Sequence, residues 1–288
     1  DRGLSRKHLH QEMDKSLRRL GVDYLDLYQC HRYDEHTPLE ETCRAMSDLV
    51  ERGKTLYWGV SEWTGPQIEA AVSICEAAGW HRPISNQPIY NMLDRHWEEG
   101  VFPTTARCGL GNVCFSPLAE GMLTGKYLDA TPEQARGGDE KQGVFLRRRF
   151  TEENIERVRG LALVAADLDV PMSTLALRWC LRRSEISSCI VGATRPAQLL
   201  ENVAAVDFDW DESLEAKVHA ILPRTSLTRS VHRPPGLAAP PHHAHQKSLA
   251  DPGVTALALL PARDRRLPNP GLRCRPAPRL PPPACPLH

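Results

Sequence analysis

Short apolar segments alternate with longer amphipathic ones along residues 1–222, and this alternation limits the possible folds most. The apolar segments predict five strands, at 22–29, 55–60, 83–87, 112–115 and 189–191. Helices are predicted around them, at 5–20, 38–52, 64–78, 151–168, 171–183, 194–203 and 212–222. Strands joined by helices of this length indicate a parallel sheet, either open and doubly wound or closed as a (β/α)₈ barrel.

Capping signals support several of the predicted helices. Ser5 is expected to cap the first helix, and Gly21 to end it. The run Thr37-Pro38-Leu39-Glu40 reads as a capping box with proline at the first helical position. Thr194 is expected to start the helix 194–203 as its N-cap. No G-x-G-x-x-G motif follows any predicted strand, which counts against a Rossmann-type dinucleotide site.

The net charge of zero conceals two halves of opposite charge. Residues 223–288 carry ten Lys or Arg and two Asp or Glu, a balance of +8, whereas 1–222 carry 26 basic and 34 acidic residues, a balance of −8. The 223–288 segment also holds 15 of the 24 prolines and no aromatic residue. Such a composition buries too little apolar surface to offset the entropy of ordering, so we expect a folded part, 1–222, and a disordered tail, 223–288.

Composition also bears on the class and location of the protein. No run approaches the ~18 apolar residues of a membrane span, so no membrane span is expected, and a neutral chain gives no reason to expect nucleic acid as a partner. The nine cysteines form no C-x-x-C pair, which argues against a disulfide framework or a four-cysteine zinc site. We therefore expect a cytoplasmic protein with no metal centre.

Polar or small residues follow each of the five predicted strands. They are His31, then Ser61 and Glu62, then Asn86 and Gln87, then Phe115 to Leu118, and finally Gly192 to Arg195. Ligands bind at the carboxyl ends of parallel strands, so these positions predict a binding site. Simpler roles exist for each: a structural histidine at His31, turn hydrogen bonds at Ser61, a core aromatic at Phe115, and a helix cap at Thr194. The start of the helix 194–203 would also suit a phosphate group.

At these residues the chain resembles the aldo-keto reductases, most closely the branch with the potassium-channel β subunits and their bacterial reductase relatives. The matching stretches are GLSRKHL, DYLDLYQCHRYDEHTPLEET, GKTLYWGVSEW, SNQPIYN, FSPLAEGMLTGKY, LALRWCLRR and IVGATRPAQLLEN. They occur in the family's order and cover about 3–205. The resemblance implies a (β/α)₈ TIM barrel of the aldo-keto reductase type, present here as about its last five βα units. It also implies hydride transfer from NADPH to the carbonyl of an aldehyde or ketone, a small-molecule substrate.

The resemblance also implies a role for each matched residue. His31 would hold or polarise the substrate carbonyl. Ser61 and Gln87 would hydrogen-bond the nicotinamide carboxamide, with Asn86 beside them, and Phe115 would lie against the nicotinamide ring. The loop around the pyrophosphate would comprise Ser116, Leu118, Gly121 and Lys126. The adenosine half would be bound by Gly192, Thr194, Arg195, Gln198, Glu201 and Asn202. Arg195 would pair with the 2′-phosphate, because guanidinium suits phosphate geometry, and so select NADPH over NADH.

The sequence departs from the family pattern in three respects. The family's proton donor is a Tyr supported by Lys and Asp in its first three strands; none of the six tyrosines here matches it, and the chain is expected to begin after those strands. Glu62 replaces an Asn or Arg, and Phe115 replaces a Tyr or Trp. Three interpretations stay open: a carbonyl reductase, a non-catalytic NADPH-binding subunit like the channel β subunits, or a non-functional fragment with a read-through or frame-shifted tail. The substrate and any homo-oligomeric state are also open.

Overall fold

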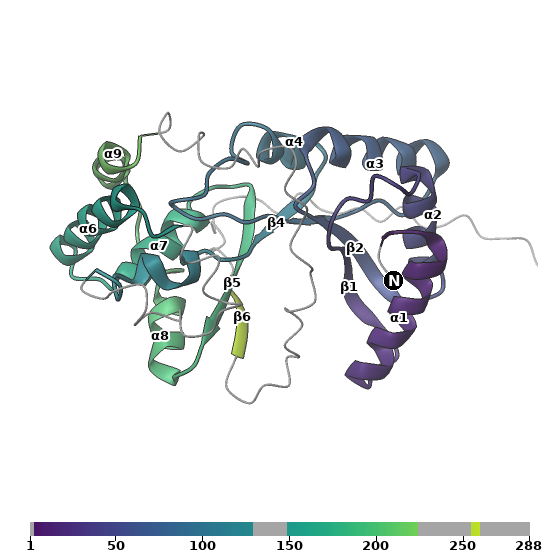
Figure 1. The fold of residues 1–288 in the computed structure, drawn as a ribbon, viewed down its shortest axis with the longest axis horizontal. Helices are drawn as coiled ribbons and strands as arrows, with labels where there is room; N and C mark the ends of the chain where they lie inside the picture. Colours follow the sequence, from purple (N-terminus) through teal and green to yellow (C-terminus); the bar gives the residue numbers. More distant parts are fainter. Residues whose placement is uncertain (1–2, 129–148, 224–254, 260–288) are drawn as a thin grey trace, which may run out of the picture.

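A curled, largely parallel sheet forms the centre of the computed structural model, which describes residues 3–128, 149–223 and 255–259 (Figure 1). Its parallel strands follow chain order: β1 (Leu25–Cys30), β2 (Thr55–Ser61), β3 (Ser85–Gln87), β4 (Gly111–Cys114) and β5 (Ile186–Ala193). In-register pairs include Leu27 with Tyr57, Ser61 with Gln87, and Cys114 with Cys189. The five predicted parallel strands are therefore confirmed, and their curl fits part of a (β/α)₈ barrel.

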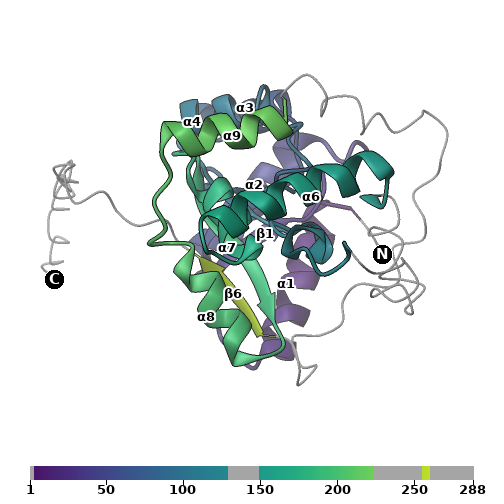
Figure 2. The same ribbon diagram turned by 90° about the vertical axis from the view of Figure 1, so that its left-hand side faces the viewer.

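Helices cover the outer face of this sheet. They are α1 (Arg6–Leu20), α2 (Leu39–Glu51), α3 (Gly65–Ala78), α4 (Val101–Arg107), the 3₁₀ helix η1 (Ala119–Thr124), α6 (Glu152–Asp167), α7 (Met172–Leu181), α8 (Pro196–Ala204) and α9 (Glu212–Ile221). Figure 1 shows α1 to α3 gathered at one side and α6 to α9 at the other. Figure 2 shows α6 and α9 side by side, and α6 also packs against α7. Most of these helices bury apolar residues against the sheet or a neighbouring helix, whereas α8 leaves Leu200 and Val203 exposed.

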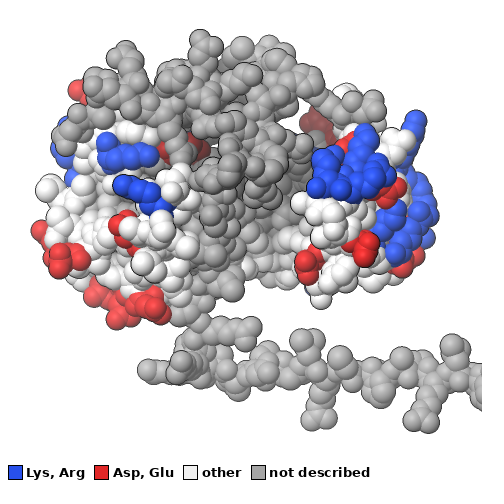
Figure 3. All heavy atoms as spheres, turned by 90° about the horizontal axis from the view of Figure 1, so that it is seen from below, with Lys and Arg blue, Asp and Glu red and all other residues white. Residues whose placement is uncertain are grey.

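The caps of α1 follow the sequence signals. The Ser5 hydroxyl accepts the His8 N–H, and Gly21 ends the helix in the left-handed conformation, with φ 68°. Leu9 and Met13 of this helix are buried. Its basic side chains, which include those of Arg18 and Arg19, remain toward solvent. Figure 3 shows Lys and Arg gathered on the right-hand side, where α1 lies in Figure 1.

Two capping predictions were wrong. Pro38, with φ −52° and ψ 130°, is the N-cap of α2, so proline precedes the first helical residue. The Thr37 hydroxyl donates to Asp34 and not to the helix. At α8 the N-cap is Arg195, one residue later than expected, because the Gln198 side chain accepts hydrogen bonds from both the N–H and the hydroxyl of Thr194. Local side-chain contacts therefore moved both helix starts.

The two faces of the sheet differ in burial. Trp58, Val60 and Cys114 lie on the helix-covered face and are fully buried. On the other face, which is the interior of a closed barrel, Leu27 and Tyr57 remain 37% and 53% exposed. Strands β2 and β3 approach each other closely at Gly59. A Cβ at this position would lie only 2.2 Å from the Ser85 hydroxyl oxygen.

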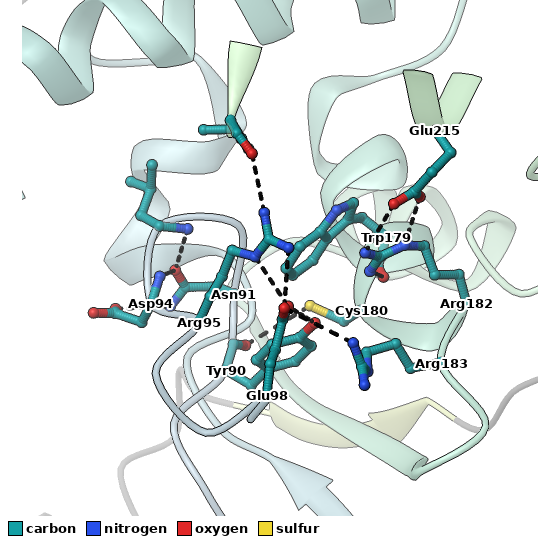
Figure 4. A network of polar contacts seen from close by, with 12 residues as sticks. Tyr90, Asn91, Asp94, Arg95, Glu98, Trp179, Cys180, Arg182, Arg183 and Glu215 are labelled. Atoms are coloured by element: carbon teal, nitrogen blue, oxygen red, sulfur yellow. Dashed lines mark hydrogen bonds and ion pairs between the residues drawn. The ribbon is translucent and has the colours of Figure 1, made fainter. Parts of the chain in front are cut away.

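A buried charged network joins α7 and α9 to the segment before α4 (Figure 4). Glu98 accepts hydrogen bonds from the Tyr90 hydroxyl (2.7 Å) and from Nε (2.9 Å) and Nη2 (3.0 Å) of Arg95. Arg95 also donates to the carbonyl of Leu222, which follows α9 (3.1 Å). The Trp179 ring lies against the guanidinium groups of Arg95 and Arg182. The network therefore ties the end of α9 to α7 and to the segment between β3 and α4.

One further strand, β6 (Thr255–Leu259), pairs antiparallel with β5. It falls within 223–288, the segment whose composition predicts disorder; its run Thr-Ala-Leu-Ala-Leu is an apolar exception in that composition. The rest of 223–288, apart from Pro223, lies outside the described residues. Among the described helices none is long and apolar enough to cross a membrane alone, although α6 and α7, bent by 98°, pass by length and composition as a pair.

Candidate functional site

The first part of the candidate site lies at the carboxyl ends of β1, β2 and β3. Ser61 and Gln87 are in register on adjacent strands, and the Ser61 hydroxyl donates to the backbone carbonyl of Gln87 at 2.9 Å. His31 directly follows β1 and is exposed. Arg32 places Nη1 2.7 Å from the His31 carbonyl and 3.5 Å from the Ser61 hydroxyl. His31, Arg32, Ser61 and Gln87 therefore lie at three adjacent strand ends, joined by hydrogen bonds through Arg32 and Ser61.

Asn86 lies elsewhere, on the helix-covered face. It pairs in register with the buried Val60, and its amide donates to the Asn112 side chain at 3.1 Å. Successive residues of a strand point to opposite faces, so Asn86 and Gln87 cannot both face one ligand. The side-chain oxygen of Asn86, Oδ1, is buried and has no hydrogen-bond partner among the described residues. The structure thus separates Asn86 from Ser61 and Gln87, in contrast to the expectation that it lies beside them at the nicotinamide.

Glu62 shows how this chain accommodates a carboxylate beside Ser61. Its backbone is left-handed, with φ 58°, and its Oε1 accepts the Ile89 N–H at 2.5 Å. Burial raises the pKa of the Glu62 carboxyl, partly offset by the Ile89 N–H and by the nearby Arg32. The carboxylate therefore binds the backbone of the segment after β3, and it lies near the Arg32 guanidinium of the strand-end cluster.

The second part of the site is the loop that follows β4. Phe115 extends the β3–β4 pairing, since its N–H donates to Pro88 and its carbonyl accepts from Tyr90. Ser116, with φ 51°, begins the loop, and Leu118 directly precedes η1. Gly121 has φ 95°, and a Cβ there would lie 2.9 Å from the Lys126 Nζ. Glycine is therefore required at position 121, where the Lys126 ammonium folds back over the loop.

The third part is the turn from β5 into α8. Gly192 lies within β5, and Thr194 and Arg195 are exposed between the strand and the helix. Gln198 caps Thr194, as described above. Glu201 is exposed, and its carbonyl accepts the Thr174 hydroxyl of α7. Asn202 is buried within α8. Glu201 and Asn202 thus lie on α8, no more than two helical turns from Arg195 at its start.

These three parts lie on one rim, because β1 to β5 are parallel and each part follows a strand's carboxyl end. The loop after β4 and α8 are connected through α7, which packs against both. Along this rim Lys126 and Arg195 have no carboxylate within 4 Å among the described residues. The side-chain amide of Gln87 likewise has no hydrogen-bond partner in that part of the chain. Within the described ranges the rim thus carries two cations without a carboxylate partner, and cations of this kind suit phosphate groups.

Some residues at this rim were not found by sequence reasoning. Arg32 was overlooked although it directly follows His31. Glu120, within the matched stretch FSPLAEGMLTGKY, was not singled out, and Arg149, its ion-pair partner 29 positions later, lies in no matched stretch. Only the three-dimensional arrangement brings them together. No group of three or more His, Cys, Asp or Glu in the described ranges could hold a metal ion.

The curled parallel sheet defines an α/β protein that fits part of a (β/α)₈ barrel, with the candidate residues at one rim. The model of the Aldo/keto reductase family matches residues 1–222. The chain belongs to this family.

Individual relatives fall into two groups. A probable voltage-gated potassium channel subunit beta of Oryza sativa subsp. japonica is 41% identical over 209 residues, and one of Arabidopsis thaliana is 42% identical over 209; each match covers 72% of this chain and 64% of the relative. An L-glyceraldehyde 3-phosphate reductase of Escherichia coli (strain K12) is 37% identical over 211 residues, 71% of this chain and 60% of the reductase. The chain therefore spans less than two thirds of the length of these relatives.

Proposed function

We propose that the chain binds NADPH along this rim and that the protein reduces an aldehyde or ketone with it. The observation that carries the proposal is the placement of two cations, Lys126 and Arg195, on the same rim as the Ser61–Gln87 pair, neither with a carboxylate partner in the described part of the chain. Lys126 would bind the pyrophosphate, and Arg195 the 2′-phosphate. The side-chain amide of Gln87 would hydrogen-bond the nicotinamide carboxamide, while the Ser61 hydroxyl holds the Gln87 backbone carbonyl. Asn86 has no part in this arrangement.

The chemistry follows from these positions. Bound NADPH supplies a hydride to the carbonyl carbon of the substrate. Ser61 and Gln87 would fix which face of the ring meets the substrate. His31 would donate a hydrogen bond to the carbonyl oxygen, where negative charge develops. The oxygen then needs a proton from an acid, which the family resemblance assigns to a Tyr paired with Lys and Asp; none of the tyrosines in this chain matches it.

One observation favours a second candidate, a non-catalytic NADPH-binding subunit. The similarity to the channel β subunits, at 41% and 42% identity, is slightly higher than that to the reductase, at 37%. Turnover separates the two candidates. A reductase oxidises NADPH in the presence of an aldehyde such as L-glyceraldehyde 3-phosphate, and the absorbance of the reduced nicotinamide then falls. A regulatory subunit would bind NADPH and leave that absorbance undiminished, because it does not oxidise the nucleotide.

Replacing Arg195 by alanine is expected to weaken NADPH binding by about 10- to 100-fold, because a charge-assisted contact to a phosphate contributes about 1.5–3 kcal/mol. NADH lacks the 2′-phosphate, so its affinity should change by less than about twofold. Fluorescence titration of both nucleotides measures this. Arg159→Ala serves as the control, since Arg159 is an exposed arginine paired with Glu156 on its own helix. Equal losses for the two nucleotides would contradict the assignment of Arg195 to the 2′-phosphate.

A further inference from the structure

The loop after β4 contains a series of backbone conformations that L-amino acids disfavour. Ser116, Ala119 and Glu120 have φ of 51°, 48° and 53°, and Gly121 has φ 95°. Three of these four residues are not glycine. Such conformations persist where surrounding contacts hold them, and they concentrate at ligand sites. Local preference therefore does not account for the shape of this loop.

The contacts that hold it come from one arginine. Arg149, which precedes α6, places Nε 2.9 Å and Nη2 2.5 Å from Oδ2 of Asp94 in the segment after β3. Its Nη1 donates to the carboxylate of Glu120. The side chains of Arg149 and Asp94 are 12% exposed, and that of Glu120 is 23% exposed. A planar guanidinium serves both carboxylates at once, which an ammonium cannot do in this geometry.

The same contacts continue to Ser116. Glu120 Oε1 accepts the Ser116 hydroxyl at 2.9 Å, so this hydroxyl is directed into the protein. The Asn91 amide donates to the Ser116 carbonyl at 3.0 Å and to Asp94 Oδ2 at 3.1 Å. The Ser116 hydroxyl is therefore held by Glu120 directly, and its carbonyl is held by Asn91, which Asp94 positions. With the hydroxyl engaged, the loop offers a ligand its backbone and the Lys126 ammonium.

We propose that Arg149 is a positioning residue that holds Ser116–Gly121 in the shape that binds the pyrophosphate, through Asp94 and Glu120 and without contacting the nucleotide. The inference rests on the NADPH site proposed above. Arg149 also balances charge, since without it two carboxylates would lie unpaired beside a loop that must accept an anion. Its loss is therefore expected to impair the pyrophosphate part of the site and to spare the adenosine part.

The test uses the full chain and two ligands. Arg149→Met is expected to weaken NADP⁺ binding by about 10- to 100-fold. Binding of adenosine 2′-monophosphate, which has no pyrophosphate, should change by less than about twofold. Arg157→Met is the matched control, because Arg157 is similarly buried, at 11% exposed, but pairs with Glu153 on its own helix. Unchanged NADP⁺ binding, or an equal loss of both ligands, would overturn the proposal.

Hydrogen exchange gives a readout that does not depend on the nucleotide. In Arg149→Met without ligand, amides of 116–125 should exchange faster while those of α8 keep their wild-type rates; unchanged exchange in 116–125 would overturn the proposal. If Arg149→Met does not fold, Glu120→Gln, which keeps the side-chain volume, should weaken NADP⁺ by about tenfold. If the wild type binds neither ligand, the proposed NADPH site is wrong, and faster loop exchange would then leave Arg149 with a role in loop shape only.

Discussion

Replacing Glu98 by glutamine is expected to lower the free energy of unfolding by about 3–5 kcal/mol, the usual cost of breaking a buried ion pair at one partner. The Glu98 and Arg95 side chains are each 7% exposed, and Arg183 lies 3.8 Å from the Glu98 carboxylate. Glutamine would leave the Arg95 charge buried without a counter-charge. It would also turn an N–H₂ group toward the Arg95 and Tyr90 groups that donate to the carboxylate. Figure 4 shows these groups converging on the carboxylate. Urea unfolding followed by circular dichroism measures the loss.

A surface ion pair provides the control for this prediction. Glu153 pairs with Arg157 but is 67% exposed, so Glu153→Gln should change the unfolding free energy by no more than about 0.5 kcal/mol. A loss of that small size for Glu98→Gln would show that the buried network does not stabilise the fold.

The same carboxylate predicts how stability depends on pH. Burial alone would raise the pKa of Glu98, but the hydrogen bonds and charge of Arg95 and the Tyr90 hydroxyl hold it below its ordinary value of 4.5. A carboxyl with a lowered folded-state pKa stabilises the fold above its unfolded-state pKa. That contribution is lost as the pH falls below 4.5 through the folded-state pKa. Glu98→Gln should therefore show a shallower loss of stability in acid than the wild type.

Replacing Trp179 by alanine is expected to cost a similar amount, about 3–5 kcal/mol. Trp179 is 1% exposed, and its ring stacks on Tyr90 with centroids 5.0 Å apart. The guanidinium carbons of Arg95 and Arg182 lie 5.2 Å and 4.2 Å from the ring centroid, so the substitution removes two cation–π contacts as well as a large core side chain. Unfolding in urea again provides the measurement.

Two comparisons sharpen the prediction for Trp179. Trp179→Phe keeps an aromatic ring between the two arginines and should lose less than Trp179→Ala. The double variant with Glu98→Gln should lose less than the two single losses combined, because both substitutions act on Arg95. Strict additivity would contradict the view that Trp179, Arg95 and Glu98 act as one network.

Periodicity and capping signals predicted most of the fold. The five strands and seven of the helices follow from apolar segments and turn residues, because these elements bury one face. α4 was missed because it has seven residues with Pro103 inside, and η1 because left-handed residues such as Glu120 disrupt its pattern. Local side-chain hydrogen bonds, between Thr37 and Asp34 and between Thr194 and Gln198, accompany the two helix starts that the sequence misplaced.

The candidate site was predicted in part. Strand ends identified Ser61 and Gln87 because parallel strands present their last residues at one rim. The resemblance did not separate Asn86 from Gln87, although the alternation of side chains along a strand does. Arg149 could not be found from sequence, since its contacts with Asp94 and Glu120 depend on how three separate segments meet.

The most direct test of the NADPH site is a titration of the full chain with NADPH, followed by nicotinamide fluorescence, with circular dichroism confirming that the chain is folded. We expect saturable binding at one nucleotide per chain, competition by adenosine 2′-monophosphate, and weaker binding of NADH. A folded chain that shows no saturable change with NADPH, or binds NADH equally well, would contradict a site in which Lys126 and Arg195 receive the phosphates.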